Sequence, residues 1–204
     1  MLRRRLLRAV PAAGACLLLD WPGRARAGAQ QYEVLADAVR LALVRAVDAP
    51  FDAEPLWDSA RQKVDWLSQM SDRLPRRILP SFEARQALLL TVRYESQRAG
   101  LSPEMILGLI QVESGFRQYA ISRVGARGLM QVMPFWAQIL GNGDVNALFR
   151  VRVNIRYGCV ILRHYLDLEN GDLFMALGRY NGSRGRAAYP NAVFSAWKRW
   201  AYSA

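Results

Sequence analysis

Glu113 is the residue in this sequence whose type and position best suit acid–base chemistry. It follows Ile106, Leu109 and Ile110 at helical spacing, so it lies on the apolar stripe of a helix. Because a carboxylate on a core-facing stripe is costly to ionise, desolvation should raise its pKa. An acid that keeps its proton near neutral pH is what general acid catalysis requires. The alternative is a structural Glu113, buried in an ion pair with Arg117.

The helix that presents Glu113 has a clear start signal. Ser102 suits the N-cap, Pro103 suits the first helical position, and Glu104 favours the positive end of the helix dipole. Periodicity and stop signals predict further helices over residues 32–46, 57–74, 81–99, 134–140, 153–168 and 172–180. The glycine-punctuated stretch 115–127 is expected to be irregular, and any short β-ribbon should lie there.

Three short motifs follow Glu113-Ser114 along the chain. They are Gly128-Leu129-Met130-Gln131, Asn154-Ile155-Arg156-Tyr157-Gly158 and Tyr180-Asn181-Gly182. Each motif alone would be noise, but their order and intervals together resemble the soluble lytic transglycosylases (SLT), which are of the glycoside hydrolase family 23 type. Those enzymes have a lysozyme-like fold and cleave peptidoglycan. The resemblance covers roughly residues 82–204.

The resemblance implies a role for each matching residue. In that family a single Glu protonates the glycosidic oxygen and then draws the proton from the C6 hydroxyl of N-acetylmuramic acid, which leaves a 1,6-anhydro end. Glu113 is expected to make both proton transfers. The residues expected to contact the sugar or orient the acid are Ser114, Ser122, Gln131, Met133, Tyr180 and Asn181. Three of them also have a purely structural interpretation: Ser114 bonding the backbone at a helix end, and Ser122 and Asn181 fixing turns.

The sequence offers Glu113 as a catalytic acid but no obvious second carboxylate to act with it. No Asp or Glu lies between Glu113 and Asp144, whereas glycosidases usually place two carboxylates around the scissile bond. This absence favours a substrate-assisted reaction, in which the C6 hydroxyl of the sugar attacks in place of a water molecule. The competing function is a hydrolytic muramidase that uses Asp144 as its base. A non-catalytic peptidoglycan-binding module is a further alternative, but such a module has no use for a buried acid.

One position departs from the family pattern. Many relatives carry a groove tyrosine three residues after the glycine that matches Gly158, and this chain has Ile161 there. A contact to the sugar is expected to be lost at that position. Trp136, Tyr119 and Tyr189 are candidate stacking platforms, although their pattern favours a core or rim aromatic in each case.

Composition and charge bound the remaining function classes. The chain has 204 residues, 52% of them apolar, and a net charge of +11. Residues 1–29 carry +5 of this charge and residues 30–204 carry +6. The basic residues are scattered, so they suit an anionic wall or headgroup surface better than nucleic acid. His164 is expected on a helix surface or in helix packing, and Cys159 in the core. With Cys16 they are too few to build a metal site. No cofactor is expected.

The first 29 residues have the pattern of a secretory signal peptide. Four arginines precede an apolar stretch from residue 9 to residue 19, and small residues at 25–29 offer cleavage sites before Gly28 or Gln30. An uncleaved basic tail is the alternative. Cys16 follows Gly14-Ala15, but the apolar stretch before it is too short for a lipoprotein signal. The protein is therefore expected in the periplasm, associated with the cell wall.

The predicted architecture is mainly α. Residues 30–80 should form a small helical segment of unknown role, and residues 81–204 a lysozyme-like catalytic domain with minimal β structure. The expected partner is the peptidoglycan glycan strand. A monomer is expected, with peripheral contact to the membrane or to wall-spanning machinery.

Overall fold

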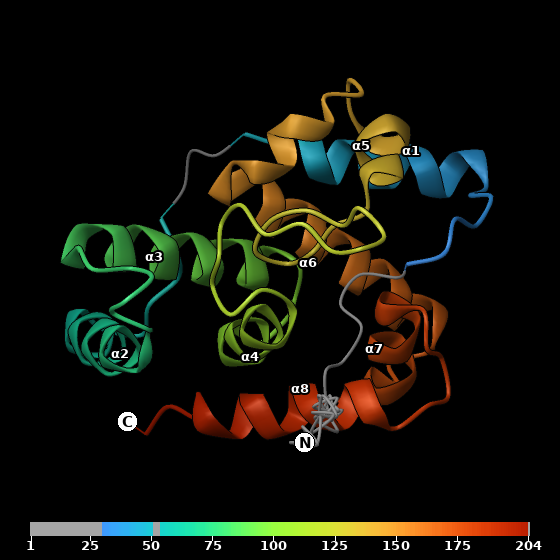
Figure 1. The fold of residues 1–204 in the computed structure, drawn as a ribbon. Helices are drawn as coiled ribbons and strands as arrows, with labels where there is room; N and C mark the ends of the chain where they lie inside the picture. Colours follow the sequence, from blue (N-terminus) through green and yellow to red (C-terminus); the bar gives the residue numbers. More distant parts are fainter. Residues whose placement is uncertain (1–29, 51–53, 204) are drawn as a thin grey trace, which may run out of the picture.

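The computed structural model describes residues 30–50 and 54–203, and the predicted signal peptide lies outside them. Within these residues the chain is built from helices (Figure 1). They are α1 (Asp37–Asp48), α2 (Ala60–Arg73), α3 (Phe82–Arg98), α4 (Pro103–Glu113), α5 (Pro134–Leu140), the 3-10 helix η1 (Val145–Phe149), α6 (Val151–Leu168), α7 (Leu173–Asn181) and α8 (Ala188–Arg199). The prediction of a mainly α chain is confirmed.

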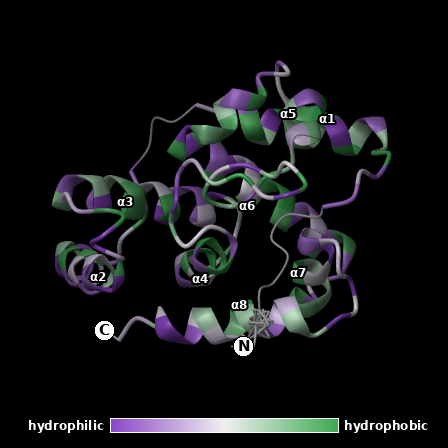
Figure 2. Ribbon diagram, in the orientation of Figure 1, coloured by the Kyte–Doolittle hydropathy of each residue, from purple (hydrophilic) through white to green (hydrophobic). Residues whose placement is uncertain are grey.

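Helix α4 is the centre of the core and carries Glu113 as its last residue. Ser102 caps it as predicted, since its hydroxyl accepts from the backbone amide of Met105 at 3.2 Å. Figure 1 shows α4 almost end-on, with α3, α6 and α8 around it. Hydrophobic and hydrophilic residues alternate along most of the helices, as expected where each helix turns one apolar face inward (Figure 2).

Helix α8 crosses α4 at very close range. A Cβ atom on Gly108 of α4 would lie 2.7 Å from the backbone nitrogen of Trp197 and 2.9 Å from its Cα. Only glycine therefore allows this approach of the two backbones. The approach sets where the start of α8, with Tyr189, lies relative to the end of α4.

The segment before residue 80 packs on the rest of the chain. Helix α1 packs on α6 and α2 packs on α3. Arg156 of α6 is 1% exposed and pairs with the equally buried Glu95 at 3.0 Å. The same guanidinium donates to the carbonyls of Val47 and Ala49 at the end of α1. This buried group ties α1 to α3 and α6, while the predicted boundary at residue 80 stays a prediction.

The stretch between α4 and α5 forms the irregular region that the glycines predict. Its only pairing in the described chain is two isolated antiparallel bridges, Ile121 with Arg127 and Arg127 with Val132. The backbone turns through positive φ at Gly125 and Gly128. The expected short β-ribbon is thus reduced to single bridges.

Helix bounds follow the local signals where those signals are strong. The helix predicted at 134–140 has those bounds, and α3 begins after its Ser81 cap. Helix α1 was expected to start at Tyr32 but begins at Asp37. The reason is tertiary, because Tyr32 packs on Phe135 and so leaves the helical path.

Helix α8 is absent from the prediction, although the sequence carries a signal for it. Tyr189, Val193, Ala196 and Trp200 recur at helical spacing and are all buried.

No helix in the described part of the chain is long and apolar enough to cross a membrane.

The α4–α8 contact gives a first testable prediction. In an isolated helix, Gly→Ala would stabilise by about 1 kcal/mol. Gly108→Ala should instead destabilise the fold by about 1–3 kcal/mol, because the new methyl meets backbone that cannot move alone. Urea unfolding measures the difference. Ser195→Ala, on the exposed face of α8, is the control and should stay within about 0.5 kcal/mol of the parent. A stabilised Gly108→Ala variant would contradict this packing.

Candidate active site

Glu113 is buried at the end of α4 with a single hydrogen-bond partner. Its side chain is 6% exposed. Oε1 accepts from the Tyr189 hydroxyl at 2.5 Å, and Oε2 has no partner among the described residues. One oxygen is therefore held by a donor, and the other is free to carry a proton.

The environment of Glu113 favours its neutral form. Burial raises the pKa of Glu113 from 4.5 to about 8, and the hydrogen bond from Tyr189 opposes that shift. The negative end of the α4 dipole also disfavours a carboxylate here. At neutral pH the group is thus a protonated acid with a pKa near the working range of a general acid.

The alternative of a structural ion pair at Glu113 is not what the structure contains. Arg117 is exposed, and the described chain shows no salt bridge between it and Glu113. Helix α4 ends at Glu113, and Gly115 and Phe116 then turn through positive φ. These turns take Arg117 off the helical path that would have placed it above the acid.

Met130 is where the other motifs meet. Its amide donates to Asn154 Oδ1 at 2.7 Å, and its carbonyl accepts from the Tyr180 hydroxyl at 2.8 Å. Its side chain fills the space above Gly158, where a Cβ would lie 2.4 Å from the Met130 sulfur. Met130, in the motif at residues 128–131, is therefore fixed by Asn154 and Gly158 of one motif and by Tyr180 of another.

The loop at residues 128–131 has a backbone that few sequences allow. Gly128 has φ 78°, and a Cβ there would lie 2.3 Å from Asn154 Nδ2 and 2.5 Å from the Leu148 carbonyl oxygen. Gln131 also has positive φ, at 51°. Its side-chain amide donates to the carbonyls of Gly128 and Ala120 at 2.9 and 3.2 Å. Gln131 thus stabilises the loop from within.

The predicted polar groove residues make local bonds in this structure. Ser114 donates to the Ile110 carbonyl at 3.2 Å. Ser122 accepts from the Ala126 amide at 3.0 Å. Asn181 donates to the Ser183 hydroxyl at 3.0 Å, while its buried Oδ1 has no partner among the described residues. Their predicted sugar contacts stay predictions, and each residue has a structural role as well.

The tyrosine that holds the acid differs from the one expected. Tyr180 was expected to point its hydroxyl toward Glu113 or the sugar, but it is fully buried and donates to Met130. Tyr189 of α8, expected as a stacking or core aromatic, donates to Glu113 instead. The helical spacing that identifies α8 could have placed Tyr189 inward, but only the close crossing with α4 brings it to the acid.

The remaining candidates differ in how exposed their side chains are. Met133 is half-buried and begins α5 as its N-cap. Ile161 is fully buried in α6, and Trp136 is 3% exposed. Tyr119 is 73% exposed and packs on Phe149.

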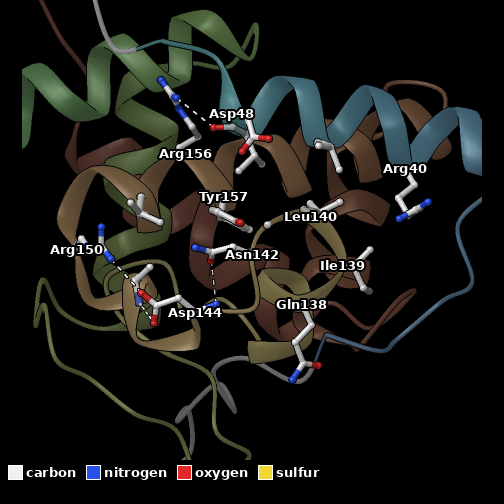
Figure 3. Close-up of a pocket in the computed structure, with 15 residues that line it drawn as sticks. Arg40, Asp48, Gln138, Ile139, Leu140, Asn142, Asp144, Arg150, Arg156 and Tyr157 are labelled. Carbon is white, nitrogen blue, oxygen red and sulfur yellow. Dashed lines mark hydrogen bonds and ion pairs between the residues drawn. The ribbon is translucent and has the colours of Figure 1, made fainter.

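Asp144, the possible second carboxylate, uses its side-chain oxygens in local contacts. It caps η1 through the amides of Asn146 and Ala147 and pairs with Arg150 at 3.0 Å. It lines a cavity of about 640 Å³ between α1, α5, η1 and α6. Figure 3 shows Asp144 toward one side of this pocket and Tyr157 near its centre. Glu113 does not line this cavity.

No group of three metal-binding side chains forms within residues 30–50 and 54–203. The chemistry that these residues support is proton transfer by one buried acid.

The two tyrosines give a second prediction, which uses pH to tell them apart. Tyr180→Phe removes a bond between neutral groups and should cost about 0.5–1.5 kcal/mol at every pH. Tyr189→Phe should cost a similar amount at pH 6, where Glu113 is protonated. At pH 9 Glu113 is ionised and loses its donor, so the cost should rise to about 1.5–3 kcal/mol. Urea unfolding at both pH values measures this, and equal pH dependence in both variants would contradict the assignment.

Comparisons with known proteins identify the family. A family model described as the transglycosylase SLT domain matches residues 91–201. A transglycosylase of Enterobacteria phage PRD1 is 37% identical over 110 residues, which are 50% of this chain and 40% of the phage protein. A membrane-bound lytic murein transglycosylase C of Actinobacillus pleuropneumoniae serotype 5b (strain L20) is 53% identical over 51 residues, 25% of this chain and 14% of that protein.

A solved structure is also similar. It is the X-ray structure of an inactive mutant of the lytic transglycosylase Slt from Pseudomonas aeruginosa, with 24% identity and a TM-score of 0.44 over 64% of this chain and 22% of that chain. This chain spans less than half the length of each of these three proteins. The family model matches more than half of the chain and includes Glu113 and all three downstream motifs, so the chain belongs to the transglycosylase SLT domain family.

Proposed function

We propose that this protein is a peptidoglycan lytic transglycosylase that uses Glu113 as its only acid and base. The bond cleaved is the β-1,4 linkage between N-acetylmuramic acid and N-acetylglucosamine. The observation that carries the proposal is a carboxyl group with a pKa of about 8, one oxygen held by Tyr189 and the other without a partner.

The reaction needs two proton transfers. Protonated Glu113 gives its proton to the glycosidic oxygen as the bond from C1 to that oxygen breaks. The resulting carboxylate then takes the proton of the C6 hydroxyl while O6 bonds to C1. The product is a 1,6-anhydro-N-acetylmuramic acid end, and no water is consumed. Tyr189 stabilises the carboxylate that exists between the two steps, because a hydrogen bond to a charged acceptor is stronger than one to a neutral acceptor.

The hydrolytic alternative lacks a free second carboxylate. Asp144 is the candidate base, but its oxygens cap η1 and pair with Arg150. It also lines a cavity that Glu113 does not reach. A binding module without activity would have no reason to bury an acid, since desolvation costs stability once that acid ionises. Both observations favour the lyase reaction.

The proposed sugar contacts come from residues on the loop between α4 and α5 and at the ends of α4 and α7. We assign the groove wall to Gln131 and Met133, with Ser114, Ser122, Tyr180 and Asn181 supporting it. Their local hydrogen bonds fit a wall that is formed before substrate binds, which lowers the cost of ordering on binding.

The proposed setting is the periplasmic face of the cell wall, with the protein as a monomer. The charge of +6 on residues 30–204 suits an anionic polymer. One relative is named as membrane-bound, which agrees with peripheral contact to the membrane or to wall-spanning machinery.

The proposal is tested by digesting purified sacculi and analysing the muropeptides by mass. Most products should end in 1,6-anhydro-N-acetylmuramic acid. Glu113→Gln keeps the shape of the side chain but cannot exchange the proton, so turnover should fall by about 10²–10⁴-fold. Turnover of the parent should also fall as pH rises through about 8, where Glu113 loses its acidic proton. A majority of reducing-end products would show a hydrolase instead.

Asp144→Asn is the matched control for the acid variant. It removes the rival base, which lines a cavity that Glu113 does not line, and should keep both the product and most of the turnover. Loss of turnover in Asp144→Asn, with Glu113→Gln still active, would overturn the assignment of Glu113.

A further inference from the structure

Residues 30–33 lie against the loop and helix that carry the proposed groove residues. Gln30 is 4% exposed, whereas residues 31–34 are all exposed. Burying a primary amide is unfavourable unless its donor and acceptor find partners. The burial of this one side chain at the start of the described chain therefore points to a specific contact.

The Gln30 amide is matched by the groove loop. Its Oε1 accepts from the backbone amide of Met133 at 3.2 Å, and its Nε2 lies 3.5 Å from the carbonyl oxygen of Gln131. The same side chain interacts with the Tyr180 hydroxyl. All three partners belong to residues assigned to the groove wall above.

Two neighbours of Gln30 anchor the same segment. The ring of Tyr32 packs edge-on against Phe135 of α5, with ring centroids 5.8 Å apart. Glu33 pairs with Arg179 of α7 at 2.6 Å. Figure 1 shows this blue part of the chain leaving α1 and running down toward α7. The segment is thus attached to the groove loop, to α5 and to α7.

We infer that residues 30–33 form an internal strap that occupies part of the glycan groove and competes with substrate. The inference rests on the proposed function, because that function defines the groove. A sugar that reaches the Met133 amide or the Gln131 carbonyl must first displace Gln30, since Gln30 already uses both. When only a fraction of molecules has an open groove, the apparent affinity falls by that fraction.

The first test measures binding of chitotetraose to purified parent protein and to the double variant Gln30→Ala/Glu33→Gln. Releasing the strap should tighten binding by at least about fivefold. Gln31→Ala is the matched control, because Gln31 belongs to the strap but its side chain is exposed, and this variant should bind like the parent. Equal or weaker binding by a double variant that melts like the parent would overturn the inference.

The second test needs no variant and follows amide hydrogen exchange in the parent. Saturating chitotetraose should speed exchange of residues 30–36, because the sugar expels the strap, while exchange within residues 128–133 slows. Slower or unchanged exchange in residues 30–36 would show that the strap stays in place beside the sugar and would contradict competition.

The two proposals fail in different ways. If the parent and the released variant both leave sacculi uncut, the lytic function fails, and the exchange pattern still decides whether the strap is displaced. If the parent cuts sacculi and strap release changes neither binding nor exchange, the function stands and the strap is only structural.

Discussion

The desolvation of Glu113 is the constraint on which the rest of this structure depends. A carboxyl group at the negative end of α4, with one hydrogen-bond donor and one unpartnered oxygen, holds its proton to about pH 8. Its folded pKa lies above its unfolded value, so ionisation works against the fold. That penalty is absent below about pH 4.5 and complete above about pH 8. The protein keeps a costly group in its core, as functional sites commonly do.

Two close contacts between elements shape the surroundings of the motif residues. Gly108 lets α8 lie directly on α4, and this crossing delivers Tyr189 to Glu113. Gly158 lets Met130 pack on α6, and this contact helps to fix the loop at residues 128–131. In both cases the lack of a Cβ atom on glycine allows the two elements to approach closely. The glycine inside each helix costs about 1 kcal/mol of helix propensity, which the tertiary contacts offset.

Much of the fold follows from local signals. Ser81, Ser102 and Pro134 mark helix starts where the structure has them, and Gly141 ends α5. The burial of Glu113 also follows from its place on an apolar stripe. Such features depend on residues within one or two turns, which is the range over which periodicity and capping act.

The pairing of distant side chains does not follow from local signals. Tyr189 reaches Glu113 across 76 positions, and Arg156 reaches Glu95 across 61. Periodicity places each of these residues on an inward face but does not say what it meets there. Tyr180 illustrates the limit, because its motif marks it as important while its partner is the Met130 carbonyl and not the acid. The predicted start of α1 is wrong for the same reason, since Tyr32 packs on Phe135 and does not continue the helix.

The motif residues therefore act first on their own fold. Asn154, Gly128 and Gln131 shape a loop with two positive φ angles, and that loop carries the proposed groove residue Gln131. A loop held by internal hydrogen bonds is already formed in the free protein, and Gln30 occupies two backbone groups at its end, the Gln131 carbonyl and the Met133 amide. The same loop is thus both preformed and partly occupied by a residue of its own chain.

The most direct test of this account is the titration of the Glu113 carboxyl carbon by ¹³C NMR, with the resonance assigned by its loss in Glu113→Gln. The account predicts a single titration with a midpoint near pH 8 in the folded protein. A midpoint near the ordinary value of 4.5 would show an ionised Glu113 at neutral pH and would contradict its role as the general acid.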